Sequence, residues 1–262
     1  MPEDTLELLD TQIISYALKG YPTWSVTGKA ISAITANEFL LVQSANPAQA
    51  NYYVLLLSRI HFPESTDGVG PMNARLNRDH PFRKMITDQV RLEFGNEFPA
   101  IVVYGNLAIA MLINKRISAL FDEAIKFLDK AQKKTIRKRF DFLLKNGVTC
   151  FPLSKSAISI GMELLQAFRA KHNLKANFRN SLNDILVFAT AIDASAKLVT
   201  SDALLSEFAS KYFEAPFSRQ EDIITVDFRE KFRPASRKSA ESKGYINKGW
   251  QVSYRNYHWG AG

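Results

Sequence analysis

Short apolar runs alternate with stretches of helical period along this chain of 262 residues. The apolar runs predict buried strands over residues 6–9, 30–34, 148–153, 196–200 and 223–227. Apolar residues at helical spacing predict helices over 11–18, 35–43, 154–172, 181–193 and 203–211. This alternation predicts an α/β fold with a mainly parallel central sheet flanked by helices.

The middle of the chain has a different character. Residues 52–60 and 113–145 have a helical pattern, whereas 61–81 carries Pro and Gly and predicts an irregular loop. Residues 100–104 fit a strand or a buried helix segment equally well, because periodicity cannot separate the two in so short a run. We therefore expect a largely helical segment between the two α/β portions.

Four acidic residues stand at the boundaries of predicted elements. Asp10 and Asp202 each follow a strand, and Glu38 and Asp184 lie at the starts of apolar helices. In a parallel sheet the ligand crevice lies outside the carboxyl ends of the strands, so these carboxylates can meet there. Several carboxylates in one crevice would bind Mg²⁺ or Mn²⁺, which prefer oxygen ligands.

Each acid also has a purely structural interpretation. Thr35 and Glu38 match a capping box, in which Glu38 would serve only the start of a helix. Asp184 is three residues after Ser181 and would favour a helix N-terminus, and Asp202 could be the N-cap of the next helix. The metal-site interpretation depends on all four acids occurring together.

The formal net charge of +8 favours a polyanionic partner, for which nucleic acid is the first candidate. Basic residues of one predicted helix could follow a phosphate backbone, or could form only a solvated face: Lys130, Lys133, Lys134, Arg137, Lys138 and Arg139. The segment 229–262 mixes basic and aromatic residues that could bind single-stranded nucleic acid, or could dock on the protein itself: Arg237, Lys238, Lys243, Lys248, Trp250 and Arg255.

Other classes of site have little support. The single cysteine, Cys150, cannot form an internal disulfide, and the four histidines have no zinc-type spacing. The start of the sequence lacks the order of a signal peptide, and no apolar run approaches the roughly 20 residues of a membrane span. A soluble cytoplasmic protein with no membrane partner is expected.

Four segments in this order resemble the motifs of the PIN-domain nucleases, including the toxin-type ribonucleases. They are 8–15 (LLDTQIIS), 31–40 (ISAITANEFL), 183–192 (NDILVFATAI) and 197–202 (KLVTSD). The resemblance implies a PIN-like fold and a Mg²⁺ or Mn²⁺ site held by Asp10, Glu38, Asp184 and Asp202. Thr11, Ser15 and Thr200 would support the site by hydroxyl hydrogen bonds.

The resemblance covers about 5–45 and 147–228, and Glu38 is much farther from Asp184 in sequence than in compact members of the family. The chain therefore divides into a PIN-like catalytic domain over 1–228, interrupted by an insertion at 46–115 and a basic helical region at 116–146. A basic aromatic C-terminal extension follows at 229–262. A second copy or another protein could bind the insertion or the extension.

A metal-dependent nuclease, most simply an endoribonuclease, is the function that these features favour, with RNA preferred over DNA through the resemblance alone. Two alternatives remain open. One is a catalytically silent PIN-like module that binds nucleic acid or acts as a scaffold, whose mark would be a missing acid. The other is the toxin half of a toxin–antitoxin pair, which a co-purifying small partner would support.

Overall fold

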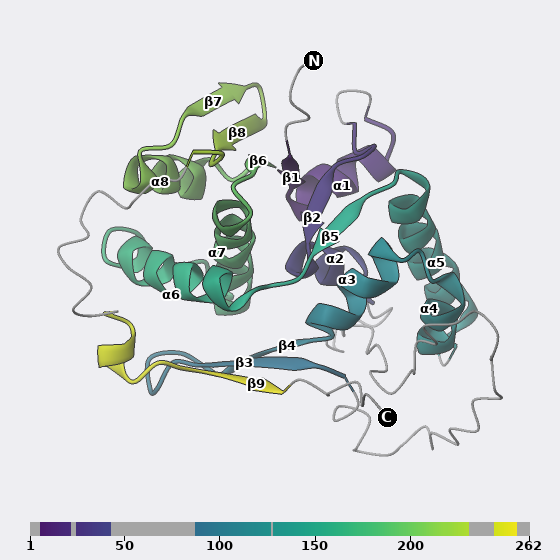
Figure 1. Cartoon of the computed structure of the whole chain (residues 1–262), viewed down its shortest axis with the longest axis horizontal. Helices are drawn as coiled ribbons and strands as arrows, with labels where there is room; N and C mark the ends of the chain where they lie inside the picture. The colour runs from purple at the N-terminus through teal and green to yellow at the C-terminus, as the bar shows by residue number, and fades with distance from the viewer. Residues whose placement is uncertain (1–5, 22–24, 43–86, 127, 231–243, 256–262) are drawn as a thin grey trace.

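The central feature of the structure is a six-stranded sheet (Figure 1). The structure is a computed structural model, which describes residues 6–21, 25–42, 87–126, 128–230 and 244–255. The strands of the sheet follow the order β5-β2-β1-β6-β8-β7. The strand bounds are β1 Glu7–Leu9, β2 Ala30–Ser32, β5 Thr149–Phe151, β6 Lys197–Thr200, β7 Phe217–Gln220 and β8 Ile223–Asp227. The expected strands over 6–9, 30–34, 148–153, 196–200 and 223–227 are all confirmed, the first four with shorter bounds.

Four neighbouring strands of this sheet are parallel. Leu9 of β1 pairs with Ile31 of β2 on one side and with Val199 of β6 on the other, and β2 pairs with β5 in the same direction. Strand β8 pairs antiparallel with β6, and β7 pairs antiparallel with β8. Because β1 and β6 are adjacent and parallel, the residues that follow them, Asp10 and Asp202, emerge at the same edge of the sheet.

Eight α-helices occur in the described residues, besides a 3-10 helix at Ile246–Lys248, and the α-helices cover the sheet in two groups. Their bounds are α1 Thr11–Leu18, α2 Ala33–Phe39, α3 Asn106–Asn114, α4 Ser118–Ile125, α5 Lys130–Lys145, α6 Lys155–Arg169, α7 Phe178–Asp193 and α8 Ala203–Phe213. Successive strand residues face opposite sides of a sheet. Accordingly Leu8 belongs to the core formed with α6, α7 and α8, whereas Leu9 belongs to the core formed with α1 to α5.

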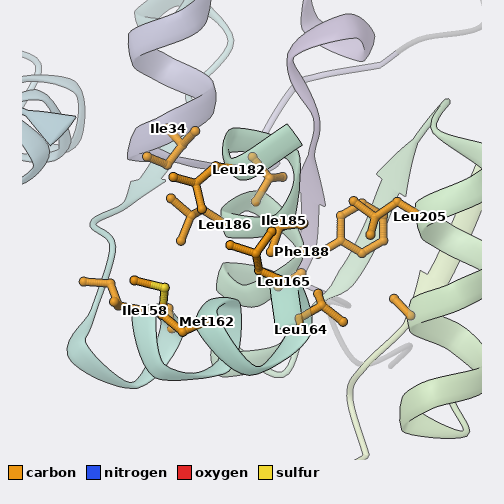
Figure 2. Close-up of a cluster of buried hydrophobic side chains, with 14 of the residues drawn as sticks. Ile34, Ile158, Met162, Leu164, Leu165, Leu182, Ile185, Leu186, Phe188 and Leu205 are labelled. Atoms are coloured by element: carbon orange, nitrogen blue, oxygen red, sulfur yellow. The ribbon is translucent and has the colours of Figure 1, made fainter. Parts of the chain in front are cut away.

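Helices α6 and α7 pack closely at the centre of the first core (Figure 2). Gly161 of α6 makes this possible, because a Cβ atom there would lie only 2.9 Å from Cδ2 of Leu186 on α7. Leu165, Leu182 and Phe188 fill the surrounding space and are almost fully buried. This packing fixes α7, the helix that carries Asp184, against the rest of the domain.

A second, antiparallel sheet has the order β4-β3-β9, with β3 at Gln89–Glu93, β4 at Ile101–Tyr104 and β9 at Gln251–Arg255. The described part of the expected insertion and the described part of the C-terminal extension thus form one sheet. Phe94, which follows β3, packs edge-to-face against Trp250, which precedes β9. The two segments that the sequence suggested as separate additions therefore form one unit.

Three expectations about the elements are wrong. The Thr35–Glu38 capping box does not start α2, because Ser32 is the N-cap and its hydroxyl accepts from the Thr35 amide at 2.9 Å. The expected helix over 181–193 already begins at Phe178, with Asn177 as its N-cap. The described part of the insertion is not largely helical, since it holds β3 and β4 as well as α3.

Other differences concern short or polar elements. Strands β3, β7 and β9 were not predicted, and the ambiguous run at 100–104 is strand β4. The expected long helical region over 113–145 consists of the end of α3 followed by α4 and α5. The expected helix over 52–60 and loop over 61–81 lie outside the described residues. Within the described residues, no helix combines the length and apolar character needed to cross a membrane.

Candidate active site

Asp10 is held at the junction of β1 and α1. It is the N-cap of α1, and its Oδ1 accepts from the Thr11 amide at 2.6 Å. Its Oδ2 accepts from the Thr200 hydroxyl at 2.7 Å, across the adjacent strand β6. Burial raises the pKa of the Asp10 carboxyl, and the charges of Glu38 and Asp202 raise it further against the opposing effect of these hydrogen bonds.

Glu38 projects from α2 towards the same place. Its Oε2 accepts from the Thr11 hydroxyl at 2.6 Å, and its Oε1 accepts from the Asn183 side-chain amide at 2.7 Å. The Glu38 carboxylate thus connects three helices, α1, α2 and α7. Because Glu38 lies in the last turn of α2, far from the N-cap Ser32, the interpretation that it serves only the start of a helix is wrong.

Asp184 and Asp202 are connected by a lysine that the sequence did not single out. The Lys175 ammonium donates to Oδ2 of Asp184 at 2.5 Å and to Oδ2 of Asp202 at 3.1 Å. Both carboxylates are mostly covered, whereas about half of the lysine side chain is exposed. Lys175 lies in the short connection between α6 and α7, so its ammonium approaches the acids from the solvent side.

Burial raises the pKa of the Asp184 carboxyl from its ordinary value to about 7. Lys175 opposes this shift, while the charges of Asp10 and Glu38 add to it. Burial would lower the pKa of Lys175, but its bonds to Asp184 and Asp202 outweigh that effect and raise it. The four acids therefore interact electrostatically as one cluster, as carboxylates that share a poorly solvated site must.

Asp202 has the expected structural role as well as its place in the cluster. Its Oδ1 accepts from the Leu205 amide at 2.9 Å, so it caps α8. Its own amide donates to the Thr200 hydroxyl at 3.1 Å. Since Thr200 also donates to Asp10, this buried hydroxyl couples the two acids at the ends of β1 and β6.

The donor chemistry of the cluster suits a hard divalent cation, because every ligand atom it offers is a carboxylate oxygen. In the described parts of the chain, however, no three carboxylate, imidazole or thiol groups are close enough together to hold one metal ion. The Lys175 ammonium lies between Asp184 and Asp202 and supplies positive charge there. A metal ion would have to displace that ammonium and draw at least three of the carboxylates closer together.

Of the three hydroxyl residues predicted to support the site, Thr11 and Thr200 donate to the acids as described above. Ser15 does not, since its hydroxyl donates to the backbone oxygen of Thr11 at 2.8 Å within α1. Asn183 and Lys175 were missed. Asn183 could have been noticed as the polar neighbour of Asp184, but Lys175 lies in a polar loop that has no periodic signal.

The predicted basic helix is α5, and the six basic residues singled out in it divide into two kinds. Arg137 forms ion pairs with Asp122 and Asp141, and Arg139 donates to the backbone oxygens of Phe39 and Leu41 at the end of α2. Lys133 donates to the backbone oxygen of Lys126 at 3.1 Å. Three lysines spaced four residues apart remain exposed on one face: Lys130, Lys134 and Lys138.

The predicted nucleic-acid contacts of the C-terminal segment are only partly described. Arg237, Lys238 and Lys243 lie outside the described residues. Trp250 is almost fully buried and its indole donates to Glu97 at 3.2 Å, so the hypothesis that it stacks on bases is wrong. The Lys248 ammonium lies 3.6 Å from Glu97, and the backbone of Arg255 pairs with Gln89 in the second sheet.

The second sheet borders the acid cluster. The Asn37 side chain, next to Glu38, donates to the backbone oxygen of Tyr104 at the end of β4 at 3.3 Å. A small pocket here is lined by Glu38, Asn183, Tyr104 and Arg179. Strand β4 and Tyr104 thus lie next to Glu38, one of the four acids.

Comparisons of the sequence and the structure with protein families, with curated proteins and with solved structures yield no match. The geometry of the acid cluster and the charge of the chain are therefore the grounds for a function.

Proposed function

We propose that this protein is a metal-dependent nuclease with a PIN-like fold that hydrolyses phosphodiester bonds. The observation that carries the proposal is the meeting of Asp10, Glu38, Asp184 and Asp202 in one crevice, linked by hydrogen bonds through Thr11, Thr200 and Lys175. Two of these acids follow parallel neighbouring strands, and the other two come from α2 and α7. RNA is preferred over DNA on the resemblance alone.

The carboxylates of Asp10, Asp184 and Asp202 would hold Mg²⁺ or Mn²⁺, with Glu38 completing the set directly or through water. The bound cation would supply an activated water and stabilise negative charge on the phosphate. Thr200 and Thr11 hold Asp10 and Glu38 in fixed orientations, and Asn183 holds the second oxygen of Glu38. The partial burial of the acids strengthens every electrostatic interaction in the crevice.

The charge of the chain supports a large polyanion over a small phosphoester as the substrate. The net charge of +8 attracts a phosphate backbone, and the exposed lysines of α5 (Lys130, Lys134 and Lys138) offer one continuous basic face. Arg137 and Arg139 contribute less to that face, because carboxylates or backbone oxygens already occupy their guanidinium groups.

One observation favours a second candidate, a catalytically silent module that binds nucleic acid. The Lys175 ammonium already pairs with both Asp184 and Asp202, so these two acids have a cationic partner without a metal. All four acids are nevertheless in place, and the lysine is half exposed on a loop from which its side chain can leave. The nuclease therefore remains the better-supported function.

The test is cleavage of single- and double-stranded RNA and DNA with Mg²⁺, Mn²⁺ or EDTA, comparing the unmodified chain with Asp10→Asn. We expect metal-dependent cutting that falls by a factor of about 100 or more in the variant, since the site loses a ligand charge. Asp222→Asn, which changes an exposed acid before β8, is the matched control and should cut normally. Binding without cutting under every condition would favour the silent module instead.

A further inference from the structure

A second pocket lies beside the acid cluster, between the end of α6 and the outer face of α8. It is an open pocket of about 340 Å³. Both of its walls lead directly to the cluster: Leu204 follows Asp202 by two residues, and Lys171 precedes Lys175 by four. A polymer that left the cluster along α8 would meet this pocket.

The pocket is built on stacked aromatic rings. Phe208 and Tyr212, one turn apart on α8, lie nearly parallel with ring centroids 5.7 Å apart. His172 meets the edge of Phe208 at 5.6 Å, and Phe208 itself is buried and supports the other rings. Leu204 is about half exposed. Flat rings and an exposed aliphatic group suit a nucleobase, which has a π face.

The charges at the mouth of the pocket are mainly positive. Lys171 and Lys211 line it from the two helices, and Glu207 is the acid among the lining residues. The Lys171 ammonium lies 6.0 Å from the centre of the Phe208 ring, so it is above the aromatic floor. An aromatic floor with two ammonium groups at its rim matches a nucleotide, which has a base at one end and a phosphate at the other.

We propose that this pocket binds one nucleotide of a single-stranded nucleic acid next to the bond that is cut. The base lies against Tyr212 and Leu204, and Lys171 and Lys211 contact the flanking phosphates. The inference rests on the proposed nuclease function and adds to it a preference for single-stranded or locally unpaired substrate. A paired base could not enter, because its edge and both faces are occupied in a duplex.

The first experiment measures binding, so that cleavage plays no part in the result. A fluorescently labelled single-stranded RNA is titrated in Mg²⁺ with three forms of the full chain. The parent carries Asp10→Asn alone. The two pocket variants carry Asp10→Asn together with Tyr212→Leu, or together with Lys171→Gln plus Lys211→Gln. Tyr212→Leu keeps the apolar bulk but removes the ring, and should weaken binding about 5- to 100-fold. The lysine pair should reduce the salt dependence by about one to two phosphate contacts.

Controls separate the pocket from general electrostatics. Lys115→Gln plus Lys145→Gln removes two exposed lysines at the ends of α3 and α5, helices that belong to the other core, and should weaken binding much less than the pocket pair. Placing an abasic nucleotide at successive positions should weaken binding at one position in particular. In the Tyr212→Leu protein that position should no longer matter.

The outcomes distinguish the two proposals. If the Asp10→Asn parent binds RNA and both pocket variants bind it as tightly as the control pair, the pocket is not a nucleotide site, although the nuclease proposal stands. The base-binding role would also be overturned if the lysine pair variant lost RNA affinity while an abasic nucleotide had the same effect at every position. If the parent binds neither RNA nor DNA, both proposals fail together.

Discussion

The Lys175 ammonium lies 2.5 Å from Oδ2 of Asp184, on a carboxyl that the proposed metal also needs. A cation bound by Asp184 and Asp202 must therefore displace the lysine. We expect Lys175→Met to bind Mn²⁺ several-fold more tightly than the unmodified chain, measured by calorimetric titration. Without metal the same variant should lose about 1 kcal/mol of unfolding free energy, since the ion pair is half exposed.

The control for that variant is Lys171→Met, which removes a lysine one helical turn earlier in the sequence. Its affinity for Mn²⁺ should stay close to that of the unmodified chain. Equal Mn²⁺ affinities in all three proteins would mean that Lys175 does not compete with the metal.

Thr200 connects the two acids that follow β1 and β6. Thr200→Val keeps the shape of the buried side chain but removes the hydroxyl that donates to Asp10 and accepts from the Asp202 amide. Unfolding free energy should fall by about 1–3 kcal/mol, the cost of leaving buried polar atoms unpaired. Urea unfolding measures this loss, and cleavage should also fall at least tenfold. Thr200→Ser retains the hydroxyl and should recover most of both losses; a serine variant as impaired as the valine variant would argue against this role.

Asn183 supplies the neutral donor beside Glu38. Asn183→Asp would bring a second carboxylate to within about 3 Å of Glu38, so we expect a loss of about 2 kcal/mol or more near neutral pH. Asn183→Ala removes the hydrogen bond without adding charge and is the matched control. The two variants should differ near pH 7 and converge as the pH falls towards about 5, where a carboxyl with a raised pKa takes up a proton. A constant difference across this range would contradict the assigned contact.

The pH dependence of stability should report on Asp184. Its pKa is about 7 in the folded protein and has the ordinary value of 3.8 when the chain is unfolded. Between these values the folded protein retains a proton that the unfolded chain has released. The stabilisation is therefore complete below about pH 4, falls as the pH rises, and is lost above about pH 7.

Asp184→Asn isolates this contribution, because asparagine cannot release a proton. In EDTA, the unfolding free energy of the unmodified chain, measured with urea, should fall by about 1–3 kcal/mol relative to that of the variant between about pH 5 and pH 7. Parallel curves for the two proteins would show that Asp184 does not titrate in this range.

Trp250 should matter for folding and not for binding. Its indole ring is buried against Phe94 and Phe98, so Trp250→Ala should cost about 3–5 kcal/mol in unfolding free energy. At a temperature where the variant is fully folded, its affinity for RNA should match that of the unmodified chain. A selective loss of RNA binding by a well-folded variant would return Trp250 to the nucleic-acid surface.

Much of the sheet and two of the structural roles at the site could be predicted from the sequence. Apolar runs flanked by Gly, Ser or Asp identified the strands that carry Asp10 and Asp202, and the N-cap role of Asp202 followed from its position. The start of α2 was misjudged, because Ser32 and Thr35 both match a capping residue and only tertiary packing selects between them. Strand β7 was missed because its residues are exposed and carry no apolar pattern.

The remaining errors have a common physical cause, which is contact between residues distant in sequence. Lys175 reaches Asp202 only because α7 and β6 lie side by side in the fold. Trp250 is buried only because β9 pairs with β3, a partner in a different part of the chain. Neither relationship produces a local pattern, so composition alone assigned both residues to other roles or to none.

Strand β3 is the central strand of the second sheet, and its two partners are made at very different times during translation. The ribosome completes β4 shortly after β3, but β9 follows only after all four acids have been synthesised. Until then one side of β3 is an unpaired edge, which is prone to pair with another chain. The second sheet, whose strand β4 lies next to Glu38, therefore reaches its final form last, and a nascent chain would hold the four carboxylates before that sheet is complete.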